Sequence, residues 1–254
     1  MKPTTIIKLI VITGLCFSSI SPTIAAESTA KREVYETNKS AIYGVKGTLK
    51  ITATVQGQAR NQEAQIWSNA THIGEGLLVA AYASLSPDLS GNNPNIHIIK
   101  ELTEIKLINK EGKEFAAEMI LHDEDLGLAY LSLDPKSDNA SEWQEQAVDI
   151  SKDVELTHLD ETINISRYSS HLNYESAVTL GIVSAIIKKP RTLYQVLNSS
   201  MSAPAFNTKG EFIGITVAHT MSDNGQQPSP VTLPVKYIRN LVKTATLLQK
   251  ELAE

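Results

Sequence analysis

The sequence predicts an all-β fold, a sandwich or a barrel, that ends in one C-terminal helix. Short runs rich in Val, Ile and Thr recur through most of the 254 residues, and Gly, Asn, Asp or Pro interrupt them. Two glycine-containing turns have the composition of β-hairpins. Only the segment near the C-terminus shows a long helical hydrophobic period, and no repeat of fixed length is present. A chain of this length is ample for a buried core.

The first 26 residues have the layout of a secretory signal peptide and are expected to lie outside the fold. Lys2 and Lys8 come first, an apolar run over 9–20 follows, and small residues lead to Ala25 and Ala26, where cleavage is expected. The apolar run is short for a permanent membrane anchor. The sequence therefore predicts an exported protein, periplasmic or secreted, that is not an integral membrane protein.

The cysteine content and the net charge exclude several kinds of site. Cys16 is the only cysteine and lies in the predicted signal peptide, so the mature chain has no disulfide, cysteine nucleophile or thiolate metal site. Removing Lys2 and Lys8 takes the 23 basic residues to 21, against 28 acidic ones, a net charge of about −7. No basic stripe is present, so nucleic-acid binding is not expected. No two histidines have metal-ligand spacing, so we expect neither a metal nor a cofactor.

The expected elements follow in order along the chain. Residues 27–40 are charged and polar and are expected to form a flexible lead-in. From Ala41 onward the β-like runs are AIYGV, LKITATV, GLLVAAY, TEIKLIN, AEMIL, LGLAYLSL, AVTLGIVSAII and EFIGITVA. INKEGKEF predicts a hairpin with Glu111 and Gly112 at its tip, and FNTKGEF predicts another around Lys209 and Gly210.

A connector and a closing helix complete the organisation. The polar segment DPKSDNASEWQEQ, from Asp134, is expected to join two halves of the chain. Pro234 stands at the start of the helical segment PVKYIRNLVKTATLLQKEL. Its spacing is expected to place six apolar side chains on one face, namely Val235, Ile238, Leu241, Val242, Leu247 and Leu248.

Five segments, in chain order, resemble the trypsin-like and HtrA-like serine peptidases. They are GEGLLVAAYASL (74–85), HDEDLGLAYLSL (122–133), ESAVTLGIVSAI (175–186), SSMSAPAFNTKGEFIGI (199–215) and VTLPVKYIRNLV (231–242). The resemblance covers about Ala41 to Leu248. It implies a chymotrypsin-like double β-barrel, with barrels at about 41–133 and 147–233 packed face to face and a closing helix over 235–252.

The resemblance breaks at the catalytic triad. Its aspartate position is kept as Asp125, its histidine position falls on Tyr82, and its nucleophile position falls on Met201. A thioether has no proton to give up, and a phenol with a pKa of about 10 is a poor base at neutral pH. A register shift of one residue would place Ser200 or Ser202 at the nucleophile position. We also expect the Tyr82 hydroxyl to donate to a buried Asp125 carboxylate, because a buried charge needs a partner.

The turn around Met201 departs further from the family motif. Ser199 stands where the family has the oxyanion-hole glycine, and Ser202 and Ala203 replace two more glycines. The candidates for a substrate cleft are Ser199, Ser200, Ser202, Val217 and His219, the last two on the strand that matches the family's substrate-binding strand. The remaining histidines, interpreted as surface or structural residues, are His72, His97, His122, His158 and His171.

The sequence favours an inactive homologue of these peptidases that acts by binding. The cleft between the barrels, beside the edge strand Ile215–His219, would take an extended peptide by strand addition. Two alternatives stay open. One is an active serine hydrolase with a relocated nucleophile, Ser200 or Ser202, and the other is a structural envelope protein. The expected partner is a protein or peptide, and a homo-oligomer is compatible with the sequence.

Overall fold

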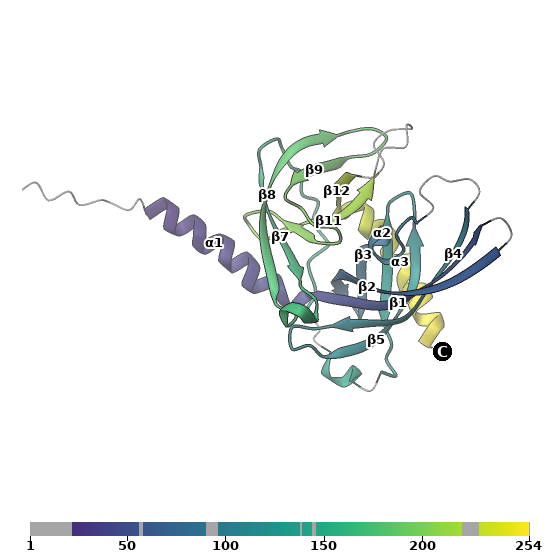
Figure 1. The fold of residues 1–254 in the computed structure, drawn as a ribbon. Coiled ribbons are helices and arrows are strands. Elements are labelled where there is room, and N and C mark those ends of the chain that lie inside the picture. Colours follow the sequence, from purple (N-terminus) through teal and green to yellow (C-terminus); the bar gives the residue numbers. More distant parts are fainter. Residues whose placement is uncertain are drawn as a thin grey trace, which may run out of the picture.

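The computed structural model describes residues 22–55, 58–89, 96–137, 139–143, 146–219 and 229–253. It contains two closed antiparallel β-barrels followed by a C-terminal helix, which confirms the all-β double-barrel prediction (Figure 1). Most of the predicted signal peptide, residues 1–21, lies outside the described residues.

The first barrel closes in the strand order β1-β2-β3-β6-β5-β4. Its strands are β1 (Ile42–Val55), β2 (Gln58–Gly74), β3 (Leu77–Ala81), β4 (Ile96–Ile108), β5 (Glu114–Asp123) and β6 (Leu128–Leu133). The runs AIYGV and LKITATV were expected as separate strands, but apart from Ala41 they belong to the one long strand β1. A short helix, α2 (Tyr82–Leu85), leaves the barrel directly after β3.

The second barrel repeats the same strand order, β7-β8-β9-β12-β11-β10. Its strands are β7 (Glu161–Arg167), β8 (Ser176–Ile187), β9 (Leu193–Leu197), β10 (Pro204–Phe206), β11 (Phe212–His219) and β12 (Ser229–Pro234). Three short 3-10 helices stand in the connections, namely η1 (Lys39–Ala41), η2 (Ala140–Glu142) and η3 (Ser170–Leu172). The two halves of the chain therefore have one topology.

A single hydrophobic cluster joins the barrels to each other and to the closing helix. Buried side chains from β3 and β6, such as Val79 and Leu128, belong to the same cluster as Phe206 and Ile215 of the second barrel. Ile238 of the closing helix is fully buried in it. The barrels are thus packed through a continuous core, which fixes the residues that lie between them.

The segment expected as a flexible lead-in is helical. Helix α1 (Pro22–Asn38) contains residues 27–38, and η1 connects it to β1. Val34 is buried, and Lys31 forms ion pairs with Glu27 and with Glu161 of β7, each at 2.7 Å. The prediction missed the helix because Val34 is the one buried apolar side chain among residues 27–38, which leaves these residues almost no hydrophobic period.

Both predicted hairpin turns are confirmed and share one construction. The side-chain oxygen of Asn109 accepts hydrogen bonds from the N–H groups of Glu111 and Lys113, and Gly112 has a φ of 77°. Asn207 accepts in the same way from Lys209 and Glu211, and Gly210 has a φ of 81°. An asparagine opens each turn, and a glycine takes the left-handed backbone conformation.

The connector between the barrels is held in place by an aromatic side chain. Trp143 stacks on Tyr43 with ring centroids 4.3 Å apart, and it meets the rings of His72 and Phe115 edge-on. Nδ1 of the buried His72 lies 2.7 Å from the carbonyl oxygen of Gln146, and its Nε2 accepts from the N–H of Gly76. His72 is therefore structural, as the sequence analysis expected.

Helix α3 (Val235–Ala253) closes the fold and begins directly after Pro234. Val235, Ile238 and Ala245 are its buried residues, so the prediction that Leu247 belongs to the apolar face is wrong. Leu247 is 55% exposed because it lies nine residues, or about two and a half turns, after the buried Ile238 and therefore on the opposite side of the helix. Among the described residues, no helix is long and apolar enough to cross a membrane.

Candidate functional site

The site predicted by the family resemblance lies where the two barrels meet. Helix α2 and the end of β3 approach the end of β11, and the turn 198–203 enters β10 beside them. The cleft candidates of the sequence analysis all come from this turn and from β11. The positions Tyr82 and Met201 belong to different barrels, as the resemblance implies.

Ser202 joins the barrels through a cluster of three hydroxyl groups, which we call the serine cluster (Ser68, Ser84 and Ser202). The Ser202 side chain is fully buried, and its Oγ accepts a hydrogen bond of 2.8 Å from the Ala81 N–H. It lies 2.8 Å from the Ser84 Oγ and 3.2 Å from the Ser68 Oγ, and those two hydroxyls are 2.6 Å apart. A buried hydroxyl of the second barrel therefore satisfies a main-chain donor of the first.

The backbone at Ser202 has the conformation that glycine takes most readily. Its φ is 61°, in the left-handed region. Its N–H donates to the Thr216 carbonyl at 2.8 Å, and the Thr216 N–H donates to the Ala203 carbonyl at 3.0 Å. The resemblance implies a glycine at this position, and the serine that stands here takes the left-handed backbone and adds a hydroxyl that reaches the other barrel.

Tyr82 lies at the start of α2, half-buried, with its ring turned toward β5. The ring stacks on His122 with centroids 4.6 Å apart and an interplanar angle of 9°. Its main-chain N–H donates to the Gly127 carbonyl at 2.8 Å. Gly127 also packs against Val217 of β11, since a Cβ on Gly127 would lie 3.3 Å from the Val217 Cβ. Gly127 is thus the residue at which the β5–β6 turn meets both Tyr82 and β11.

The expected hydrogen bond from Tyr82 to a buried Asp125 is wrong. The Asp125 side chain is 79% exposed and forms an ion pair with Arg191, whose Nη1 donates to the Asp125 carbonyl at 3.1 Å. Asp125 lies two residues before Gly127, in the exposed turn after β5. It needs no buried partner there, because water and the Arg191 guanidinium solvate the carboxylate.

The other residues of the turn differ in their burial. Met201 is half-buried and packs against the shared core, as expected for a thioether that fills space. Ser199 is half-buried, and its Oγ donates to the Val196 carbonyl at 3.0 Å. Ser200 is exposed. Of the three serines in this turn, Ser202 is the one in contact with the first barrel.

The end of β11 provides a main-chain edge beside this turn. Val217, Ala218 and His219 pair on one side with β12, and β10 pairs with β11 only as far as Ile215. Val217 is buried, whereas Ala218 and His219 are half-buried. Within the described part of the chain, no strand pairs with the second edge of Val217–His219.

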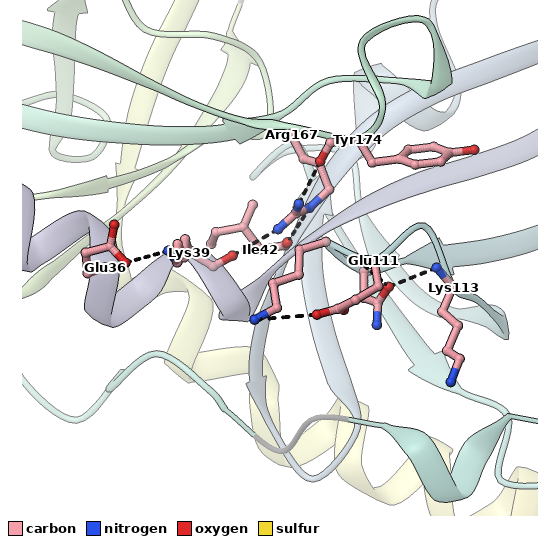
Figure 2. A network of polar contacts seen from close by, with 9 residues as sticks. Glu36, Lys39, Ile42, Glu111, Lys113, Arg167 and Tyr174 are labelled. Carbon is pink, nitrogen blue, oxygen red and sulfur yellow. Dashed lines mark hydrogen bonds and ion pairs between the residues drawn. The ribbon is translucent and has the colours of Figure 1, made fainter.

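Arg167 of β7 provides a second polar connection between the barrels (Figure 2). Its buried guanidinium donates to three main-chain carbonyls, those of Lys39, Ile42 and Tyr174, at 2.8–3.1 Å. Burial lowers the pKa of the guanidinium from its ordinary value. The Arg167 N–H donates to the side-chain oxygen of Asn69 at 2.7 Å. Nothing in the sequence around Arg167 marked it, because its partners are backbone carbonyls, and two of them, those of Lys39 and Ile42, are distant along the chain.

In the described structure, the polar and aromatic groups of the junction have partners other than those of a catalytic triad. Acyl transfer needs a hydroxyl with an imidazole in reach and a carboxylate behind the imidazole. Ser202 instead bonds to a main-chain N–H and to other hydroxyls, Tyr82 stacks on His122, and Asp125 points into solvent.

Two of the hollows formed by the described residues have no triad position in their walls. The larger, of about 800 Å³, lies between the first barrel and the end of α3, with His72, Trp143 and Gln249 in its wall. The smaller, of about 480 Å³, lies between α1 and β8. Groups of three or more His, Cys, Asp or Glu side chains that could hold a metal are not found in the described ranges.

Comparisons with known proteins do not assign the chain to a family. No protein-family model matches the sequence, and a search of curated proteins finds no match. The double-barrel architecture is consistent with a chymotrypsin-like fold.

Proposed function

We propose that this chain is an exported, non-catalytic homologue of trypsin-like and HtrA-like peptidases that binds an extended peptide segment. The observation that carries the proposal is the buried Ser202 hydroxyl and its hydrogen bond from the Ala81 N–H. The turn that presents the nucleophile in those peptidases here presents a buried hydroxyl that bonds the barrels together. A thioether stands at the nucleophile position, and loss of nucleophile or base lowers the rate about a millionfold in a comparable enzyme.

The free edge of β11 supports the binding part of the proposal. A peptide that adds a strand to Val217–His219 would gain main-chain hydrogen bonds on an edge that the described strands leave unpaired. The half-buried side chains of Ala218 and His219 would contact the side chains of such a peptide. This mode of binding needs neither Tyr82 nor Met201 to do chemistry.

The signal-like N-terminus supports export, to a periplasm or to the outside of the cell. The alternative of an active hydrolase would need Ser200 or Ser202 as nucleophile. Ser202 is buried and Ser200, though exposed, is not bonded to an imidazole in the described structure. The alternative of a structural envelope protein predicts no peptide binding at β11.

The test is selection of peptides from a random display library, followed by fluorescence-polarisation binding of the enriched sequences. Two variants, Ala218→Pro and His219→Pro, each remove one main-chain N–H. Neighbouring N–H groups of a strand point to opposite edges, so one of them faces β12 and the other faces the free edge. We expect one variant to lose binding with its fold intact, and the other to lose stability instead.

Two results would contradict the proposal. Enrichment of no peptide would remove strand addition as the function. Equal binding by both folded proline variants would show that the peptide does not use the main chain of β11.

A further inference from the structure

Three strands of the first barrel continue beyond it as a three-stranded part of the same sheet, which we call the strand extension (Lys50–Thr54 of β1, Gln58–Gln65 of β2 and His97–Thr103 of β4). β1 is its central strand, paired with β2 on one side and β4 on the other. Figure 1 shows the three strands projecting together away from the rest of the molecule. β5 pairs with β4 only from Lys106 to Ile108, so in the described structure the outer edge of His97–Thr103 has no partner strand.

Ile99 is an apolar side chain on the polar face of this extension. Its side chain is 71% exposed. Directly opposite it on β1 is Thr52, whose hydroxyl bonds to Asn61 of β2 at 3.0 Å. His97 and Glu101, two residues before and after Ile99, share its face and are also exposed. The barrel core therefore does not explain an isoleucine at this position.

In the described structure, the outer edge of His97–Thr103 has no outward-facing lysine. Lysine on an edge strand usually keeps another chain from pairing with it. The only lysine here, Lys100, is turned inward, and its Nζ donates to the carbonyls of Ser86 and Pro87 at 3.2 and 2.8 Å. The outer edge of β4 thus offers main-chain hydrogen-bonding groups beside an exposed isoleucine.

We propose that this edge is a self-association surface, on which a second copy of the chain pairs its β4 antiparallel across a two-fold axis at Ile99. Such an axis stands perpendicular to the sheet, so residues of the same face lie opposite each other. Ile99 then faces Ile99 of the second copy, and His97 faces Glu101 on both sides of the axis. The apolar pair is central, and a carboxylate lies opposite an imidazole at each end.

Other registers and the other edge are less favourable. An axis at Lys100 would place lysine opposite lysine, and an axis at Glu101 would place two carboxylates together, which destabilises a strand pair. The β2 edge, Gln58–Gln65, has no large apolar side chain. Charge and hydrophobic complementarity therefore favour the β4 edge and, over the registers centred on Lys100 and Glu101, the one centred on Ile99.

The test is sedimentation equilibrium of the full chain and its variants. One strand pair is a small interface, so loading concentrations from about 1 to about 500 µM cover the weak affinities expected. We expect a reversible monomer–dimer equilibrium. Ile99→Lys should raise the dimer dissociation constant at least about tenfold, since two like charges would then face each other. Leu180→Lys is the matched control, because Leu180 is 48% exposed on β8 and should leave the equilibrium unchanged.

Two variants at His97 test the register through effects of opposite sign. His97→Lys places a positive charge opposite Glu101 and should tighten the dimer, whereas His97→Glu places a second carboxylate there and should weaken it. His97 lies opposite the uncharged Thr54 within its own chain, so neither variant disturbs an ion pair in the monomer. A monomer at every concentration would overturn the proposal. So would a dimer dissociation constant that does not change with Ile99→Lys, or one that changes in the same direction with both His97 variants.

Discussion

Replacement of Arg167 by methionine should lower the free energy of unfolding by about 3 kcal/mol. The variant keeps most of the apolar stem but leaves the carbonyls of Lys39, Ile42 and Tyr174 without their donor. Hydrogen bonds from a charged group contribute about 1.5–3 kcal/mol each. Part of that sum is offset, because the variant no longer buries a charge, and burial disfavours the charged form, as its lowered pKa shows. About 3 kcal/mol is a large share of an ordinary domain's stability of about 5–15 kcal/mol.

The assay is urea unfolding followed by tryptophan fluorescence and circular dichroism. Trp67 reports on this region directly, since its Nε1 donates to the Arg167 carbonyl. Arg167→Lys should recover about half of the loss, because an ammonium reaches fewer of the three carbonyls. Arg239→Met is the matched control. The Nε of Arg239 also donates to a main-chain carbonyl, that of Ile150, but the Arg239 side chain is 36% exposed. The loss of unfolding free energy should therefore stay below about 1 kcal/mol.

A loss below about 0.5 kcal/mol for Arg167→Met would refute this reasoning, since surface substitutions have effects of that size. The guanidinium would then contribute nothing beyond what water supplies, and the barrels would be held by the shared core and the remaining polar contacts, such as that from the Ala81 N–H to Ser202.

Three further predictions concern the barrel junction and the closing helix. Ser202→Ala should lower the free energy of unfolding by about 1–3 kcal/mol, because it leaves the buried Ala81 N–H without its acceptor. The loss for Ser202→Gly should be about 1 kcal/mol smaller, because glycine tolerates the left-handed backbone at this position. Urea unfolding of both variants measures the difference. Burial raises the pKa of the Tyr130 hydroxyl, which donates to the Ile238 carbonyl, so the folded state keeps this proton to a higher pH than the unfolded state. The free energy of unfolding should therefore fall as the pH rises above about 10. Tyr130→Phe should flatten that fall in unfolding curves measured between about pH 9 and 11. Gly214→Ala should prevent folding or lower the free energy of unfolding by more than about 3 kcal/mol, because the added Cβ would lie 1.8 Å from the Leu233 carbonyl oxygen. Loss of the cooperative thermal transition is the readout.

The strands that could be predicted from the sequence are β1, β3, β4, β5, β6, β8 and β11, because turn residues bound their β-branched runs. Strand β2 was not predicted, since residues 58–65 are polar and exposed and pair only with β1. The short strands β7, β9, β10 and β12 were also missed, because each has too few residues to show a clear strand pattern in the sequence. The two hairpin turns were predictable because their asparagine and glycine make local contacts.

The junction between the barrels was less predictable, because it depends on contacts between distant segments. The sequence showed that Ser202 departs from a glycine motif, but not that its hydroxyl reaches Ala81. It marked Asp125 by resemblance, whereas the structure brings Gly127, two residues later, against Tyr82. Arg167 carries no local signal at all, since three backbone carbonyls are its partners.

The most direct test of the proposed function is incubation of the purified protein with a fluorophosphonate, read by intact mass. The Met201→Ser variant is measured beside it, with an active serine peptidase as the positive control. We expect neither form to gain mass, because Met201 has no hydroxyl and the restored serine would find a tyrosine at position 82 and an outward-facing Asp125. A stoichiometric adduct on the natural protein would contradict the account, and the labelled peptide would identify a working nucleophile.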